Sequence, residues 1–344
     1  MTRACFETPG MLPARYVLVL TNLCNLDCRF CFQDRKYKPG SLTLSDWIRF
    51  VDQLPSYARV TLTGGEPLAF KYFDDIFTHV ADRFDCNMIS NGLLLNEARV
   101  ELLLSKPLFR TLSISIDNVG NTIRDVRPNQ WDKLVQTLSH FVDRRNELGL
   151  KTLFDVKTVV LDDNAEQLFD IHRYCVEVLR CDSHAYQFLK GSAIQHSDVM
   201  VDESLMYEPS EAPVYQKLNV IREELERVRR YNVERGAVAF MHPNLASLTS
   251  PSALPPLDEL NRKEHAPHKL NPCMFPWSSV HINNDGNLFP CMAISMGNVK
   301  VTPLKDIIFG EGFEQFRKVL RERGTVECCN RCGWIRFKDS VVEA

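Results

Sequence analysis

Short apolar segments alternate with amphipathic ones through the first half of the chain, and this alternation limits the possible folds more than any other feature. The first of them, residues 15–20, is a nearly continuous apolar run, which is typical of a strand that is covered on both faces. Because right-handed crossovers place each strand beside the previous one, the pattern predicts an α/β fold with a parallel sheet. The expected strands are 15–20, 60–63, 87–90, 111–116, 153–161 and 185–189. The expected helices are 47–54, 72–83, 97–105, 131–148 and 165–179.

Three cysteines follow the first expected strand, and they have the spacing C-x3-C-x2-C: Cys24, Cys28 and Cys31. In a parallel barrel, the segments that follow the strands gather at the face where catalytic residues lie. With 12 cysteines in 344 residues, chance would give this spacing in about one or two chains in a hundred. Three thiolates on one short loop can hold three irons of a cubane cluster and leave the fourth iron open to a ligand.

The cysteine spacing, with the aromatic Phe30 before the last cysteine, resembles the motif of the radical S-adenosylmethionine (SAM) superfamily. The resemblance implies a partial (β/α)6 TIM-like barrel over about residues 12–192, a 4Fe–4S cluster on the three cysteines, and SAM chelating the open iron. It implies reductive cleavage of SAM to methionine and a 5′-deoxyadenosyl radical, which removes hydrogen from a substrate carbon. An electron donor such as flavodoxin or ferredoxin is then expected as a partner.

Other segments at the expected strand ends resemble the SAM contacts of that family. Gly64-Gly65-Glu66-Pro67 is similar to the GGE segment that contacts the SAM amino group, and its glycines allow a backbone to approach a ligand closely. Arg124 is expected to pair with the SAM carboxylate, although Arg127 is equally basic and a solvated surface role stays open for both. The expected cofactor-binding residues are Phe30, Gly64, Gly65, Glu66, Asn91, Ser115, Asp117 and Arg124.

A second group of cysteines lies near the carboxyl end of the sequence. Alternating apolar residues predict a hairpin over residues 280–289, with Asn284-Asp285-Gly286 in its turn. The spacing of Cys273 and Cys291 around this hairpin resembles the opening of the SPASM domain, which carries auxiliary iron–sulfur clusters in radical SAM enzymes. The resemblance places this domain at residues 269–344, and residues 193–268 are expected to form a bridging helix and a linker.

The ligands expected in this second group are Cys273, Cys291, Cys329 and Cys332. No cysteine follows Cys332, so a truncated SPASM, or twitch-like, unit with one auxiliary 4Fe–4S cluster fits better than two clusters. A structural zinc would suit four thiolates equally well by spacing, and the upstream motif favours the cluster. Cys328 adjoins a ligand and is interpreted as a bystander, with an alternative ligand or a hydrogen donor to a substrate radical as the open alternatives.

Composition narrows the expected partners and compartment. Lys and Arg number 41 against 44 Asp and Glu, a formal net charge of −3, so no nucleic acid is expected as the partner. The sequence has neither the pattern of a signal peptide nor an apolar run of membrane-spanning length. We therefore expect a cytoplasmic protein without a membrane partner, in which clustered thiols are metal ligands more often than disulfides.

The predicted function is a radical SAM oxidoreductase or epimerase. An auxiliary cluster with four protein ligands favours dehydrogenation, and epimerisation is the other outcome considered. About a dozen residues precede the first expected strand, too few for a fused leader-binding domain, so a small polyol or sugar-like substrate is preferred. The alternative is a maturase that epimerises, cross-links or oxidises a ribosomally made peptide. A remote alternative is a zinc-stabilised, non-catalytic binding protein.

Overall fold

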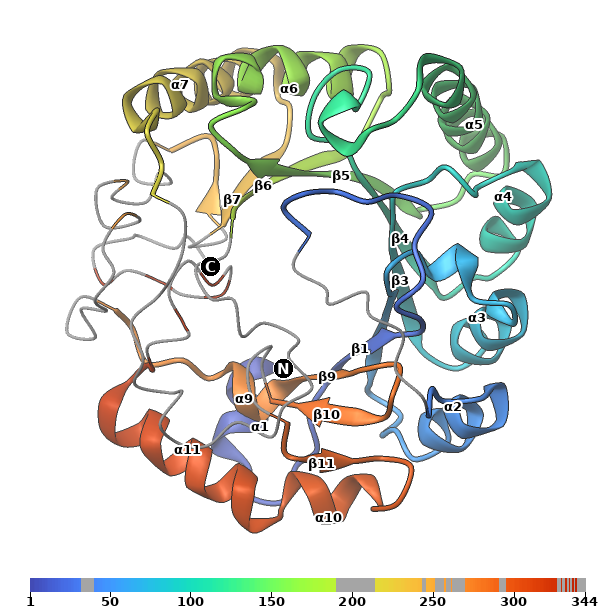
Figure 1. Ribbon diagram of the computed structural model, residues 1–344, viewed down its shortest axis with the longest axis vertical. Coiled ribbons are helices and arrows are strands. Elements are labelled where there is room, and N and C mark those ends of the chain that lie inside the picture. Colours follow the sequence, from blue (N-terminus) through green and yellow to red (C-terminus); the bar gives the residue numbers. More distant parts are fainter. Residues whose placement is uncertain are drawn as a thin grey trace.

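One sheet of 11 strands organises the molecule, and in the computed structural model its order is β11-β10-β9-β1-β2-β3-β4-β5-β6-β7-β8. The sheet curves around the centre of the molecule, and helices α2 to α7 lie on its outer side (Figure 1). Every neighbouring pair from β9 through β1 to β7 is parallel. The structure describes residues 1–31, 40–189, 214–242, 246–250, 257, 261, 270–290, 295–326, 329, 332, 334, 336 and 338.

The six strands predicted from the apolar segments are confirmed, with ends that differ by one or two residues. Their apolar side chains are buried on the helix-facing side, as Tyr16 and Leu18 of β1 illustrate. The observed strands are β1 (Arg15–Val19), β2 (Arg59–Thr63), β3 (Asp85–Ser90), β4 (Phe109–Ser115), β5 (Leu153–Val160) and β6 (Ser183–Phe188).

The predicted helices are also present, and their first residues follow from local chemistry. Thr43 and Asp46 form a capping box at the start of α2, the side chain of Asn96 caps α4, and Pro128 occupies the first turn of α5. The helices on the outer side are α2 (Leu44–Val51), α3 (Phe73–Ala81), α4 (Glu97–Leu104), α5 (Pro128–Glu147), α6 (Leu168–Glu177) and α7 (Leu218–Arg235).

The expected linker contains two short strands that the sequence did not reveal. β7 (Ala239–His242) extends the parallel sheet beside β6, and β8 (Ala246–Ser247) pairs with it in the antiparallel sense. Residues 239 and 241 are buried and residues 240 and 242 are half-buried, so β7 does alternate. Four residues before a proline-rich stretch are too few to identify a strand from its period.

The predicted carboxyl-terminal hairpin is confirmed as β9 (Ser279–Ile282) and β10 (Asn287–Phe289). Its turn needs Gly286, which has a φ of +90° and lies so close to Asn298 that a Cβ atom would be 2.6 Å from Oδ1. The hairpin also joins the main sheet, because β9 pairs in parallel with β1. The sheet is therefore continuous across the predicted domain boundaries at 192 and 269, which stay predictions.

The remaining elements cover the hairpin and the amino-terminal end of β1. Phe6 of the first helix packs edge-on against Trp277, with ring centroids 4.9 Å apart. These elements are α1 (Thr2–Glu7), α9 (Phe275–Ser278), β11 (Gly297–Asn298), α10 (Leu304–Ile308) and α11 (Glu311–Arg323).

Two buried histidines join α6 to the outer face of β6. Nδ1 of His172 lies 3.0 Å from Nδ1 of His184, and Nε2 of His172 lies 2.7 Å from the amide oxygen of Asn232 on α7. The other ring nitrogen of His184 meets the hydroxyl of Thr158 at 2.8 Å. Burial lowers the pKa of His172 to about 4, although the hydrogen bond to Asn232 opposes this shift.

We expect the free energy of unfolding to fall as the pH is lowered from about 6.5 towards about 4. In this window an unfolded histidine binds a proton whereas folded His172, with a pKa of about 4, does not. Above the pKa that His172 has in the unfolded chain, its contribution to the free energy of unfolding is complete and amounts to about 3 kcal/mol. Urea unfolding of His172→Gln and of the control His79→Gln, a half-buried histidine paired with Asp52, at several pH values checks this. An unchanged pH slope in His172→Gln would contradict it.

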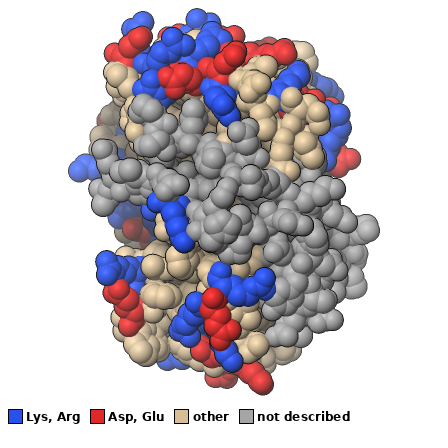
Figure 2. All heavy atoms as spheres, turned by 90° about the vertical axis from the view of Figure 1, so that its left-hand side faces the viewer, with Lys and Arg blue, Asp and Glu red and all other residues tan. Residues whose placement is uncertain are grey.

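Acidic and basic side chains are interspersed on the described surface of the face shown in Figure 2. On α7, Arg227 pairs with Glu224 and Arg229 pairs with Glu226, each three residues apart. The described residues of this face therefore form no extended surface of one charge, in line with the near-neutral sequence. Within the described part of the chain, no helix is long and apolar enough to cross a membrane.

Candidate active site

The cysteine loop follows β1 and packs against the two glycines that follow β2. The backbone N–H of Gly65 donates to Thr21 O at 2.7 Å, and that of Glu66 donates to Leu23 O at 2.8 Å. A Cβ atom on Gly65 would lie 2.3 Å from Leu23 O, and one on Gly64 would lie 2.8 Å from Thr21 O. In this structure the two glycines allow a close approach to the backbone that leads into the cysteines. Their expected contact with SAM stays a prediction.

We expect Gly65→Ala to destabilise the protein by about 1–3 kcal/mol, the usual cost of overpacking. The new methyl group would push on the backbone of Leu23, one residue before Cys24, so the iron content of reconstituted protein should fall as well. Chemical denaturation and iron analysis measure the two effects. Gly312→Ala is the matched control, because its nearest neighbour is the flexible end of Met296 at 3.3 Å. Equal stability and iron content in both variants would contradict this prediction.

Glu66 is fully buried and joins the ends of β2 and β3. Its carboxylate accepts hydrogen bonds from the backbone N–H of Leu68 at 3.1 Å, from Ser90 Oγ at 2.8 Å and from the backbone N–H of Asn91 at 2.8 Å. Burial raises the pKa of Glu66, and these three donors act in the opposite direction. The expected contact of Glu66 with SAM stays a prediction. What the structure adds is a positioning role for its carboxylate.

Asn91, which follows β3, lies beside the first cysteine. Its amide Nδ2 donates to Asn25 Oδ1 at 2.8 Å and lies 3.8 Å from Cys24 Sγ, while its Oδ1 accepts from the backbone N–H of Leu93 at 3.0 Å. The sequence placed Asn91 among the SAM contacts. The structure places it against a predicted cluster ligand.

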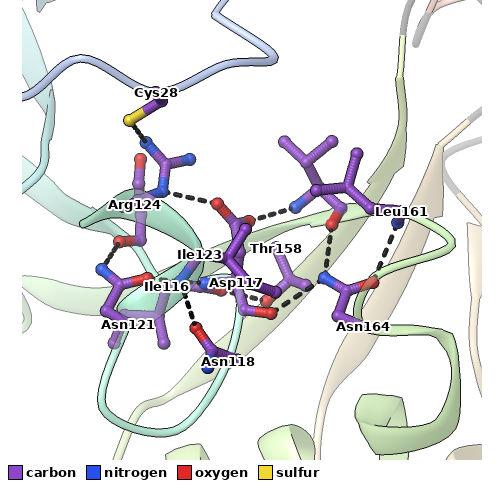
Figure 3. A network of polar contacts seen from close by, with 12 residues as sticks. Cys28, Ile116, Asp117, Asn118, Asn121, Ile123, Arg124, Thr158, Leu161 and Asn164 are labelled. Carbon is purple, nitrogen blue, oxygen red and sulfur yellow. Dashed lines mark hydrogen bonds and ion pairs between the residues drawn. The ribbon is translucent and has the colours of Figure 1, made fainter. Parts of the chain in front are cut away.

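Asp117 and Arg124 form a buried ion pair that reaches the second cysteine (Figure 3). The Asp117 carboxylate accepts from Arg124 Nε at 2.5 Å and from the backbone N–H of Val159 at 2.7 Å. Another guanidinium nitrogen, Nη1 of Arg124, lies 3.8 Å from Cys28 Sγ. The ion pair therefore joins the carboxyl ends of β4 and β5 to the cysteine loop.

The surroundings of Arg124 separate it from Arg127. The guanidinium of Arg124 lies over the ring of Phe30, 5.2 Å from its centroid. Burial alone would lower the pKa of Arg124, but the Asp117 carboxylate and the nearby thiols of the cysteine loop more than offset it, so this pKa is raised. Arg127 is exposed and contacts Gln130 at the start of α5. Of the two arginines, Arg124 is the one at the site.

Two asparagines that the sequence analysis did not single out hold the loop around Asp117. Asn121, at a φ of 51°, accepts from the backbone N–H of Asp117 at 3.0 Å and donates to Ser115 O at 3.0 Å. Asn164 donates to the backbone oxygens of Asp117 and Val159, both at 2.8 Å (Figure 3). Asn164 follows β5, so examination of every strand end would have identified it as a candidate. The half-buried Ser115 lies at the carboxyl end of β4, as predicted.

Three of the four predicted ligands in the second cysteine group are described. Burial raises the pKa of Cys273, and the thiols of Cys329 and Cys332 raise it further. The backbone N–H of Cys332 donates to Cys329 O at 2.9 Å, which closes the knuckle between them. Cys291 and Cys328 lie outside the described residues.

The chemistry of the first cysteine loop fits an iron–sulfur cluster. Three thiols share one short loop, and N–H groups of Asn91 and Arg124 lie near the sulfurs of Cys24 and Cys28, as donors to thiolates do. Among the described residues, no three His, Cys, Asp or Glu side chains converge as the ligands of a single ion. In a cubane each thiolate binds a different iron, so its ligands need not converge on one point.

Two family models match the chain, one to each cysteine group. The radical SAM superfamily matches residues 18–175, and the SPASM iron–sulfur cluster-binding domain matches residues 273–333. This chain carries a radical SAM domain followed by a SPASM domain. The radical SAM domain indicates an enzyme and implies a 4Fe–4S cluster and SAM, and the SPASM domain implies auxiliary iron–sulfur binding as well. Both predicted resemblances are confirmed.

Alignments with individual relatives each cover a part of this chain. The sporulation killing factor maturation protein SkfB of Bacillus subtilis (strain 168) is 30% identical over 168 residues, which cover 48% of this chain and 40% of SkfB. A probable GTP 3′,8-cyclase of Methanocella arvoryzae is 26% identical over 234 residues, which cover 65% of this chain and 71% of the cyclase. The chain thus spans about two-fifths of SkfB and over two-thirds of the cyclase.

Among solved structures, Streptococcus suis SuiB bound to its precursor peptide SuiA has a similar fold. The TM-score is 0.62 at 19% sequence identity, and the match covers 94% of this chain and 71% of SuiB. At this identity the likeness concerns the fold. It extends across both the radical SAM region and the SPASM region.

Proposed function

We propose that this radical SAM enzyme modifies a peptide. The observation that carries the proposal is the 30% identity to SkfB, whose name describes a maturation protein. The fold shared with SuiB, which was crystallised with a precursor peptide, adds support. The preferred polyol or sugar-like substrate has no support among these relatives, so the peptide alternative replaces it.

The residues proposed to hold the cofactors are those that the site brings together. Cys24, Cys28 and Cys31 would hold the cluster, which together with SAM supplies a radical able to remove hydrogen from a substrate carbon. Asn91 would donate a hydrogen bond to the Cys24 sulfur, and Arg124 to the Cys28 sulfur. These donors stabilise thiolate charge and hold the loop at the strand ends.

We further propose that the peptide is oxidised. If Cys273, Cys291, Cys329 and Cys332 hold every iron of the auxiliary cluster, no iron there is open to the substrate. Their role is then to keep an electron acceptor near the site, so that a substrate radical can lose one electron and one proton. Epimerisation is the competing outcome, with a thiol such as Cys328 as the hydrogen donor.

The proposal is tested with anaerobically reconstituted protein, SAM, a reductant and a peptide encoded beside its gene. We expect peptide-dependent formation of 5′-deoxyadenosine and a product that has lost the mass of two hydrogen atoms. An unchanged mass in ordinary water, with one deuterium gained in deuterated water, would establish epimerisation instead. Absence of any peptide-dependent 5′-deoxyadenosine would defeat the peptide proposal.

A nucleotide is the second candidate substrate, because the GTP 3′,8-cyclase match covers more of this chain than the SkfB match does. The same assay with GTP in place of the peptide separates the candidates. Consumption of GTP coupled to 5′-deoxyadenosine would favour the nucleotide.

A further inference from the structure

Strand β5 carries a charged pair on the inner side of the curved sheet. Phe154 points outward and packs against Phe141 of α5, with ring centroids 6.3 Å apart. Because side chains alternate along a strand, Asp155 and Lys157 point to the opposite, inner side. Nζ of Lys157 lies 2.8 Å from Oδ2 of Asp155. This pair belongs neither to the cysteine loop nor to the Asp117 network.

Asp155 is fully engaged by neighbours on three strands. Besides Lys157, its carboxylate accepts from Ser113 Oγ of β4 at 2.9 Å and from Ser183 Oγ of β6 at 2.8 Å. The Asp155 side chain is only 9% exposed, so little of it is left for a ligand. Its role is to hold the Lys157 ammonium in place.

Lys157 itself is accessible. Its side chain is 35% exposed, although it lies on the inner side of the sheet. An ammonium has three N–H donors, and within the described residues Asp155 is the one acidic side chain that pairs with it. The accessible member of the pair is therefore the Lys157 ammonium, which offers N–H donors to a ligand, whereas the carboxylate oxygens of Asp155 are occupied and buried. That combination suits an anion and does not suit an amine.

Lys157 is also close to the predicted SAM site. It is the register partner of Ser115 on β4. Val159, on the same side of β5 and about 7 Å farther along the strand, donates its backbone N–H to Asp117, which pairs with Arg124. A group bound at Lys157 would thus lie near the carboxyl end of β5, where Val159 holds Asp117.

We propose that Lys157, positioned by Asp155, binds a carboxylate of the peptide substrate, either an acidic side chain or the peptide's carboxyl end. This inference rests on the proposed peptide function and names a substrate feature for it. A point charge with free donors beside the hydrogen-abstraction site can fix which residue of a peptide is presented. SAM also carries a carboxylate, so the test must separate the two sources.

The test measures binding to SAM-loaded holoenzyme with its cluster oxidised, so that no turnover occurs. The probes are N-acetylglutamate N-methylamide and the corresponding glutamine compound, and affinities are taken from ligand-detected NMR. We expect the wild type to prefer the glutamate probe by about tenfold, the size of one hydrogen bond between charged groups. The preference should vanish in Lys157→Met and largely survive in Lys157→Arg. Lys151→Met, which removes an exposed lysine just before β5, should keep it.

Each outcome decides the matter. No preference in the wild type, or a preference unchanged in Lys157→Met, overturns the proposal. Loss of SAM affinity in Lys157→Met without any glutamate preference in the wild type would assign Lys157 to the SAM carboxylate instead and also overturn it. If the glutamate preference depends on Lys157 but the protein modifies no peptide, Lys157 is a carboxylate-binding residue and the proposed peptide function is wrong. Failure of the Lys157 proposal is therefore distinguishable from failure of the proposed function.

Discussion

Cys24→Ala should remove one iron–sulfur cluster and all cleavage of SAM. With one cubane on each cysteine group, reconstituted wild-type protein should contain about eight irons per chain and the variant about four. A cubane with two protein ligands is not retained well enough to bind SAM, so formation of 5′-deoxyadenosine should fall below detection. Iron and sulfide analysis and quantification of 5′-deoxyadenosine measure these effects.

The matched control is Cys86→Ala, because Cys86 is buried near the amino end of β3, where its Sγ lies 3.8 Å from the backbone oxygen of Asn87. Its iron content and SAM cleavage should match those of the wild type. If Cys24→Ala kept full iron and still cleaved SAM, the assignment of the cysteine loop would be wrong. A wild type with about four irons and one zinc would leave that assignment standing and make the second group a zinc site.

The parallel part of the fold could be predicted because its strands obey a simple rule. A strand covered on both faces must be apolar along most of its length, and β1 is a short apolar run of that kind. The pairing of β9 with β1 could not be predicted in this way. Arg15 and Ser279 are 264 residues apart, and nothing in either segment specifies the other as its partner.

The sequence predicted which residues lie together at the site. It did not predict the hydrogen-bond partner of each residue. The position after a strand identified Asp117 and Glu66, because parallel strands bring their ends together. That Glu66 turns towards Ser90 and the backbone of Asn91 depends on the spacing of β2 and β3. Asn121 holds its contact with Ser115 through a positive φ, which asparagine tolerates and which no spacing reveals.

The ion pair between Asp117 and Arg124 should give the largest stability effect of any single substitution at the site. Asp117 is fully buried and the Arg124 side chain is 14% exposed. Asp117→Asn keeps the shape but leaves a buried guanidinium without its counter-charge, which costs about 3–5 kcal/mol. Chemical denaturation measures this. Arg29→Met is the matched control, since its pair with Asp163 joins the same loop to the end of β5 but is 76% and 55% exposed, and its loss should cost less than about 1 kcal/mol.

The double variant Asp117→Asn with Arg124→Met separates charge from packing. If an uncompensated charge causes the loss, removal of the guanidinium should recover part of it, and the two substitutions should be strongly non-additive. Additive losses would mean that the pair contributes through packing alone. Because Arg124 also lies 3.8 Å from Cys28 Sγ, iron retention should stay low in the double variant even where stability recovers. Recovery of both would contradict a role for Arg124 towards the cluster and leave it a purely structural partner of Asp117.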